Sequence, residues 1–240
     1  GDLDGDGEYD FVVDRLSTTT ASNEYLEAYK RDGTFLWRMD MGFNSTNQYN
    51  IEPGSSAISI GEGDRVTVYD MDGDGRAEVM VCTANGVTVT NAAGQRVASI
   101  TSANNLTQFI SMLDGMTGAE KSRVTVPNPF ISDGPLNGHF AIMYCDGVHP
   151  SFLFSGANRR DSNGGDNGFN GIITTWDCRN GQLIQRWSWS PPGGGNFADG
   201  HQIRIADVDN DGKDEFVQIG FVVHDAGDHA PDGGFAAAGF

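Results

Sequence analysis

The nonapeptide Asp2-Leu3-Asp4-Gly5-Asp6-Gly7-Glu8-Tyr9-Asp10 is the first of three segments that share one pattern of acidic residues and glycine, and this pattern predicts the architecture of the chain. It returns as Asp70-Met71-Asp72-Gly73-Asp74-Gly75-Arg76-Ala77-Glu78 and again as Asp207-Val208-Asp209-Asn210-Asp211-Gly212-Lys213-Asp214-Glu215. Each copy follows the pattern D-x-D-x-D-G-x-x-[D/E], and each is followed by a short apolar segment that predicts a strand. Self-similarity of this kind indicates a chain built from structural repeats.

The spacing of the copies predicts a fourth repeat. They begin at residues 2, 70 and 207, so that the first interval is 68 residues and the second, 137, is close to twice as long. A missing copy is therefore expected near residue 140. The segment Tyr144–Pro150 lies there, keeps Asp146 and Gly147, and precedes the apolar segment 151–154. We interpret it as a degenerate copy that has lost its other carboxylates.

The oxygen donors of the nonapeptide are those that calcium prefers. Carboxylates at positions 1, 3, 5 and 9 and a backbone carbonyl at position 7 can surround one hard cation, and glycine at position 6 permits a sharp turn. The alternative, a set of hydrated acidic turns, is disfavoured by three matches in the same register. The sequence thus predicts three structural calcium sites. Their carboxylate ligands would be Asp2, Asp4, Asp6, Asp10, Asp70, Asp72, Asp74, Glu78, Asp207, Asp209, Asp211 and Glu215, with backbone carbonyls from Glu8, Arg76 and Lys213.

The segments between the acidic loops read as β-hairpins. Alternating apolar residues flank turns rich in glycine, aspartate and asparagine at 25–38, 87–100, 109–126 and 172–189. One unit is then a strand entering the acidic loop, a strand leaving it and a hairpin, which is the four-stranded antiparallel blade of a β-propeller. We predict an all-β fold in which residues 1–240 form one propeller domain or part of one, with about four to five blades in an incomplete ring.

Composition limits the function classes. With 33 acidic against 15 basic side chains the formal charge is −18, which excludes a nucleic-acid partner that needs a basic surface. No run of 18 apolar residues predicts a membrane span. Calcium sites and the acceptor triplets at Asn44 and Asn105 favour a secreted protein carrying N-glycans. Of the three cysteines, Cys145 and Cys178 fall on turns at one end of the degenerate blade, where a disulfide could replace the lost calcium.

Several strings resemble the rhamnogalacturonan lyases of polysaccharide lyase family 11. They include the three nonapeptides and the segments 28–38, 114–118 and 176–183, and they run in order along nearly the whole chain. The resemblance implies an eight-bladed calcium-binding propeller that cleaves rhamnogalacturonan I, an acidic plant polysaccharide, by β-elimination. It also implies that this chain would hold about half of the family's catalytic domain.

Elimination beside a uronate needs a cation for the carboxylate, a base for the C5 proton and help for the leaving oxygen. Aligning the loops at Asp70 and Asp207 sets Asp64 opposite His201, and in the degenerate unit Phe140 falls there with His139 beside it. Histidine titrates near neutrality and suits proton transfer. The candidate catalytic residues at the mouth of the channel are therefore His201, His139 and Asp64, with Arg159 and Arg160 as a carboxylate clamp.

Other interpretations stay open at this point. A histidine at a strand start is often a hydrogen-bonded structural residue, and paired arginines in a loop are often simply hydrated. The second alternative is a non-catalytic calcium-dependent propeller for carbohydrate or protein binding, similar to the repeats of integrin heads. A glycoside hydrolase is a weaker third option, because no carboxylate pair outside the acidic loops stands out.

Overall fold

The computed structural model describes residues 1–15, 22–46, 58, 65–160, 168–190, 202–218 and 221–223. They form sixteen strands and two short 3-10 helices, Phe43–Ser45 and Ile131–Asp133, so the all-β prediction is confirmed. Every strand pair is antiparallel. No helix in the described part of the chain has the length and apolar content that crossing a membrane would require.

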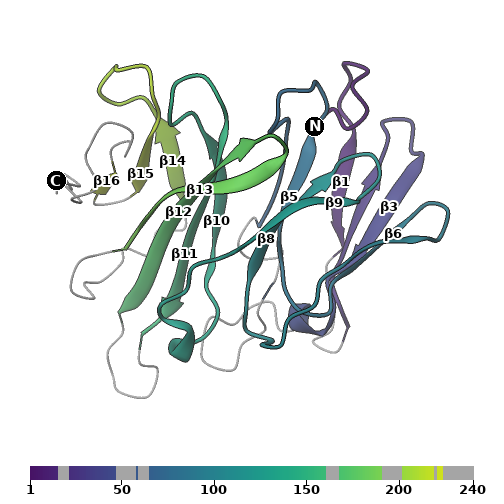
Figure 1. Ribbon diagram of the computed structural model, residues 1–240, viewed down its shortest axis with the longest axis horizontal. Helices are drawn as coiled ribbons and strands as arrows, with labels where there is room; N and C mark the ends of the chain where they lie inside the picture. The colour runs from purple at the N-terminus through teal and green to yellow at the C-terminus, as the bar shows by residue number, and fades with distance from the viewer. Residues whose placement is uncertain are drawn as a thin grey trace.

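The strands make four sheets, which stand side by side in Figure 1. We number them along the chain and give their strands in spatial order. The first sheet is β1 (Phe11–Arg15), β2 (Tyr25–Tyr29), β3 (Phe35–Asp40), β6 (Thr88–Asn91) and β7 (Arg96–Ser99); the second is β4 (Val66–Tyr69), β5 (Glu78–Thr83), β8 (Phe109–Asp114) and β9 (Glu120–Thr125); the third is β10 (Asn137–Met143), β11 (Ser151–Arg159), β12 (Phe169–Arg179) and β13 (Gln182–Trp189); the fourth is β14 (Ile203–Ala206), β15 (Glu215–Gln218) and β16 (Phe221–Val223).

Strand pairing confirms the repeat, including its degenerate copy. In the second, third and fourth sheets the last residue before the loop pairs with the residue that closes it: Tyr69 with Glu78, Met143 with Ser151, and Ala206 with Glu215. In the first sheet Gly1 takes this place, because the amide of Asp10 donates to its carbonyl at 2.8 Å. All four loops consequently lie at the same end of the molecule, the upper end in Figure 1.

The hairpin β6–β7 departs from the predicted four-stranded unit. It follows β5 of the second sheet along the chain, yet β6 pairs with β3, which makes the first sheet five-stranded. Burial explains why β6 pairs with the first sheet, because Val89 of β6 is fully buried beside the indole of Trp37. The indole nitrogen of Trp37 donates in turn to the carbonyl of Gly115, a turn residue of the second sheet, at 2.8 Å. The hairpin thus covers the seam between the two sheets.

The core lies between the sheets rather than within one of them. A large cluster joins the first three sheets and includes Trp37, Trp176 and Phe152, all nearly inaccessible to solvent. A smaller cluster joins the third and fourth sheets around Leu153 and Phe216. Burial of this kind is the main stabilising term of folding, and here it fixes how neighbouring sheets are spaced.

One expectation about covalent modification is wrong, and another stays a prediction. Cys82, Cys145 and Cys178 are all buried free thiols, so no Cys145–Cys178 disulfide forms. The side chain of Asn44 is buried, and its amide nitrogen donates to the carbonyl of Asn85 at 2.8 Å; its glycosylation stays a prediction. Asn105 is exposed, and its glycosylation stays a prediction.

Candidate functional site

Each acidic loop is organised around its first aspartate. In the first loop, Asp2 accepts backbone amides with both carboxylate oxygens, from Gly5 at 2.7 Å and Asp6 at 3.2 Å on Oδ1 and from Gly7 at 2.9 Å on Oδ2. Asp70 repeats all three contacts at 2.7–3.1 Å, and Asp207 repeats two of them, from Asp211 at 3.1 Å and from Gly212 at 3.0 Å. The first carboxylate therefore folds the loop around itself.

The last acid closes the loop. Asp10, Glu78 and Glu215 are buried, and each accepts the amide of the residue after the first aspartate, at 3.0, 2.9 and 2.7 Å respectively. Burial raises the pKa of Glu78 above its ordinary value, although hydrogen bonds from Lys121 and from the amide of Met71 oppose that shift. The glycine at position 6 adopts a left-handed conformation in all three loops, with φ of 88°, 87° and 89°.

The loops gather oxygen donors at the spacing of a metal site. In each loop, three carboxylates offer oxygens that lie within 4.8 Å of one another: Asp2, Asp4 and Asp6; Asp70, Asp72 and Glu78; Asp207, Asp209 and Glu215. The donor set holds no nitrogen or sulfur, which suits a hard cation such as calcium or magnesium rather than zinc. These residues fit the predicted ion. Asp10, Asp74 and Asp211 were also predicted as ligands and are not in these trios.

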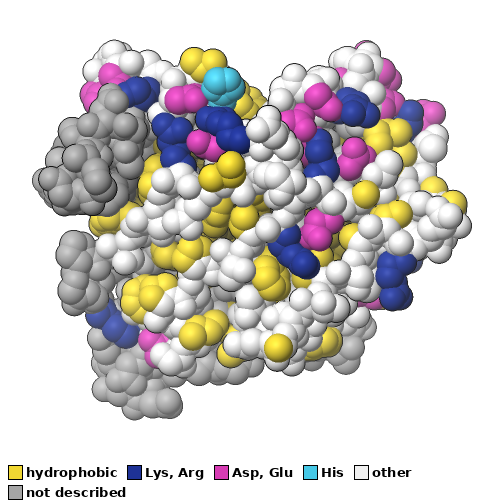
Figure 2. Space-filling view, viewed as in Figure 1, with side chains coloured by type: hydrophobic (Ala, Val, Ile, Leu, Met, Phe, Trp, Pro, Cys, Tyr) yellow, Lys and Arg dark blue, Asp and Glu magenta, His cyan; other side chains and the backbone are white. Residues whose placement is uncertain are grey.

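The degenerate loop holds itself together with ion pairs where a disulfide was expected. Asp146 accepts the amides of Val148 and His149 and contacts the His149 ring at 2.9 Å. Burial alone would raise the pKa of Asp146, but these hydrogen bonds outweigh it and hold the pKa well below its usual range. Arg179 lies 3.4 Å from Asp146 and 3.2 Å from Asp177, so basic side chains supply the positive charge that an ion would bring. Figure 2 shows acidic and basic side chains intermingled at this end of the molecule.

Three of the predicted catalytic residues, His139, Arg159 and Arg160, are described, and they belong to the opposite end of the sheets, where β4 and β10 begin. Asp64 and His201 lie outside the described residues. His139 pairs with Ser155, and Arg159 lies four residues after Ser155 on β11, so strand alternation sets His139 and Arg159 on the same face of the third sheet. Their roles in catalysis stay predictions.

The two arginines differ in their surroundings. The guanidinium of Arg159 lies 5.1 Å from the centre of the Phe169 ring, a cation–π geometry. Arg160 follows the end of β11, and its amide donates to the carbonyl of Gly168 at 3.0 Å. Arg159 is thus backed by an aromatic ring of the neighbouring strand β12.

The strand pairing corrects the sequence alignment at this end. His139 lies four residues before Met143, and Arg65 and Gln202 lie four residues before the equivalent Tyr69 and Ala206. His139 is therefore equivalent to Arg65, and Phe140 is equivalent to Val66 rather than to Asp64, because Tyr144, and not Asp146, holds the place of Asp70.

That alignment missed Arg65. It is buried between the second and third sheets, and its Nη1 donates to the carbonyl of Leu136 at 3.4 Å. Gln108 also donates to that carbonyl, at 2.7 Å, and accepts the amide of Leu136. Counting back from each strand pair rather than from each loop would have found this arginine beside the predicted mouth.

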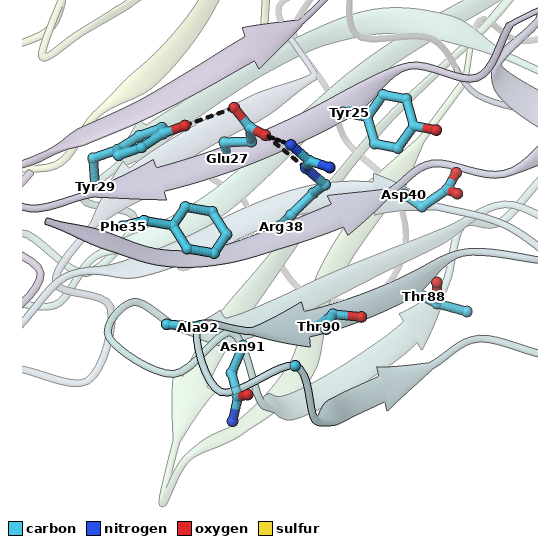
Figure 3. A pocket seen from close by; sticks show the side chains of 11 residues that line it. Tyr25, Glu27, Tyr29, Phe35, Arg38, Asp40, Thr88, Thr90, Asn91 and Ala92 are labelled. Carbon is cyan, nitrogen blue, oxygen red and sulfur yellow. Dashed lines mark hydrogen bonds and ion pairs between the residues drawn. The ribbon is translucent and has the colours of Figure 1, made fainter. Parts of the chain in front are cut away.

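A groove of about 680 Å³ crosses the face of the first sheet. Figure 3 shows Glu27 on β2 between Tyr29 and Arg38, whose polar ends are directed toward it. Burial by itself would raise the pKa of Glu27, but hydrogen bonds from Tyr29, Arg38 and Arg15 lower it. Both arginines are thereby engaged by one carboxylate, and the groove also presents aromatic side chains, the hydroxyls of Thr88 and Thr90 and the carboxylate of Asp40.

Comparison with known proteins decides the family. The sequence profile described as rhamnogalacturonan lyase family 11, C-terminal domain, matches residues 1–237. The chain belongs to this family. Among curated relatives it is 29% identical to rhamnogalacturonan exolyase YesX and 28% identical to rhamnogalacturonan endolyase YesW, both from Bacillus subtilis, over 90% of its own length.

Solved structures of this rhamnogalacturonan lyase family agree. The chain is similar to the crystal structure of YesW and to that of a Bacillus licheniformis rhamnogalacturonan lyase, each with a TM-score of 0.67 and 27% identity over 94% of this chain. It spans 36% of the two curated relatives' length and 40% of those two structures.

Proposed function

We propose that this chain serves a polysaccharide lyase that cleaves rhamnogalacturonan by β-elimination. The family match over residues 1–237 carries the proposal, and the names of two relatives, an exolyase and an endolyase, supply the substrate class. Because the chain spans 36% of those relatives, the activity is proposed for a protein that contains it rather than derived from its own site.

In this proposal the end of the sheets opposite the acidic loops forms the mouth. Removal of the proton next to a uronate carboxylate needs a base, which we assign to His139, His201 or Asp64. It also needs positive charge at the carboxylate as electron density moves onto it, which we assign to Arg159 and Arg160. Arg65 joins them as a positioning residue, because its equivalence to His139 places it at a strand start beside the same mouth.

We also propose that the three acidic loops bind calcium and that the sheets are blades of a propeller. The support is the oxygen-only donor set, the left-handed glycines and the equivalent position of the loop in successive sheets. Bound ions would offset the repulsion among clustered carboxylates and so stabilise each strand-to-strand connection. Calcium at the levels found outside cells supports a further proposal, that the protein is secreted.

The lyase proposal is tested by ultraviolet absorbance of the purified chain, and of any longer polypeptide containing it, with rhamnogalacturonan I and calcium. We expect a rise from the unsaturated product that is lost in His201→Ala while calcium-dependent melting is unchanged. A calcium-stabilised protein that produces no unsaturated product from this polysaccharide would contradict the proposal.

A second function, carbohydrate binding without cleavage, is favoured by the groove on the first sheet. Its aromatic residues Tyr25, Tyr29 and Phe35 lie beside the hydroxyls of Thr88 and Thr90, a combination suited to a neutral sugar face. Calorimetry with rhamnogalacturonan oligosaccharides separates the two functions. Binding that is lost in Tyr25→Ala, with no product released by the parent chain, would favour this alternative.

A further inference from the structure

The first two acidic loops carry unequal charge. Residues 2–10 hold five acidic side chains and no basic one, a formal charge of −5. Residues 70–78 hold four acidic side chains and Arg76, a formal charge of −3. Since the attraction of a loop for a divalent cation grows with its negative charge, the two loops differ before any contact from elsewhere in the fold is considered.

Contacts with lysine side chains widen the difference in charge between the first and second acidic loops. The ammonium of Lys121, on β9, lies 2.7 Å from Oδ2 of Asp72 and 2.7 Å from Oε1 of Glu78. Glu78 is buried and its other oxygen accepts the amide of Met71 at 2.9 Å, so both of its oxygens are engaged. Arg76 in addition lies 2.9 Å from Asp74. Three of the four carboxylates of the second loop therefore already face a cationic side chain.

The first loop is less neutralised at its predicted ligands. Lys30 lies 2.6 Å from Oδ2 of Asp4, and Arg31 contacts the carboxylate of Glu8. Glu8 was predicted to bind an ion through its backbone carbonyl, so that ion pair engages no predicted carboxylate ligand. Its last acid, Asp10, accepts only backbone amides in the contacts described, from Leu3 and Arg31.

We propose that Lys121 is an internal cation that competes with calcium for Asp72 and Glu78, and that the second loop consequently binds calcium more weakly than the first. The inference rests on the calcium binding proposed above and goes beyond it by ranking two sites. Lys121 also belongs to the seam with the third sheet, where its carbonyl accepts the side chain of Gln182 at 3.3 Å and Ser122 accepts the amide of Leu183 at 3.0 Å. Without calcium, its ammonium stabilises a loop at that seam.

The test is calorimetric titration of the chelator-treated chain with calcium alone, in the parent and in Lys121→Gln. We expect at least two affinity classes in the parent, and about a tenfold tightening of the weaker class in Lys121→Gln. Lys121→Arg, which keeps the charge, should leave that class unchanged. Lys30→Gln is the matched variant of the first loop, and it should tighten calcium binding at a different class of sites, the one of higher affinity.

Melting in chelator provides a second readout that separates competition from a general structural role. Lys121→Gln should melt at a lower temperature than the parent in chelator, because Asp72 and Glu78 lose their counter-charge, yet gain more on calcium addition. Unchanged or weaker calcium affinity in Lys121→Gln would overturn the ranking while leaving calcium binding intact. A parent chain that binds no calcium would overturn both proposals.

Discussion

The backbone amide of Ala77 donates a hydrogen bond of 2.7 Å to the carbonyl of Asp2, joining the second acidic loop to the first. Asp214 makes the equivalent bond to Tyr144 at 3.2 Å, between the fourth sheet and the third. In both cases the donor directly precedes the residue that closes its loop, and the acceptor opens the preceding loop. Neighbouring units are thus joined by a backbone bond that repeats along with the sequence motif.

The seam between the second and third sheets cannot use this bond, because Pro150 occupies the donor position and has no amide hydrogen. Side chains connect the two sheets instead. The hydroxyls of Tyr69 and Tyr144 lie 2.6 Å apart, and this hydrogen bond raises the pKa of Tyr69 to about 12. The one unit that lost its carboxylates therefore also differs in how it joins its neighbour.

Tyr69→Phe should destabilise the chain by about 1 kcal/mol, because it leaves the half-buried hydroxyl of Tyr144 without this partner. Urea unfolding followed by tryptophan fluorescence measures the change. Tyr9→Phe is the matched control, since the Tyr9 side chain is largely exposed, and it should unfold at the parent's midpoint. Equal midpoints for all three proteins would show that the tyrosine pair contributes nothing to this seam.

Asp14→Asn should stabilise the chain at neutral pH. The Oδ1 atom of Asp14 is buried without a hydrogen-bond partner, and burial, with a smaller contribution from Glu24, raises the pKa to about 6. A raised carboxyl pKa means that the folded state binds the proton more tightly, so stability falls as the pH rises from about 4 to 6 and is constant above.

The expected gain in Asp14→Asn is about 1 kcal/mol above pH 6, after allowing for the partial exposure of the side chain, and it should vanish near pH 4. Melting temperatures of parent and variant across this range check it. A variant that is less stable than the parent at pH 7 would mean that the ionised carboxylate has a favourable partner.

Asp146→Asn should destabilise the chain, which is the opposite of the effect expected for Asp14→Asn. The pKa of Asp146 is held below its usual range by hydrogen bonds from His149 and Val148, so the stability it contributes is complete above the unfolded value of about 4 and is lost only as the pH falls through the folded value. The variant should therefore lose about 1 kcal/mol at every pH between 5 and 8. Melting temperatures of Asp146→Asn and Asp14→Asn, measured over the same pH range, show whether the two substitutions have opposite effects. A loss of stability in Asp146→Asn that is confined to low pH would contradict the prediction.

The sequence predicted the parts of the fold that local chemistry fixes. The acidic loops and the strands that leave them are where the motif put them, because aspartate, glycine and the following apolar residues act within a few positions. It did not predict that β6 pairs with β3, since that choice depends on the burial of Val89 against Trp37 in another sheet. Nor did it predict the ion pair between Asp146 and Arg179, which lie 33 positions apart and are paired where a disulfide was expected.

For the predicted mouth, sequence reasoning named His139 and Arg159 as candidates and did not name Arg65. The reason is that an alignment drawn through the aspartates sets Asp146 opposite Asp70, whereas the strand pairing sets Tyr144 there, two residues earlier. A buried arginine hydrogen-bonded to a backbone carbonyl, as Arg65 is to Leu136, carries no local sequence signal.

Asp2→Ala and Asp6→Asn should separate the two roles of the acidic loop, holding its own backbone and binding an ion. Asp2 accepts three backbone amides, so Asp2→Ala should cost about 1–3 kcal/mol even in chelator, because those donors lose their partner. Asp6 accepts the amide of Glu8 through one oxygen at 2.8 Å, a bond that an asparagine oxygen can also accept. Asp6→Asn should therefore match the parent's melting temperature in chelator and show a smaller rise when calcium is added. If calcium raises the melting temperatures of Asp6→Asn and of the parent equally, the charge of Asp6 takes no part in binding the ion.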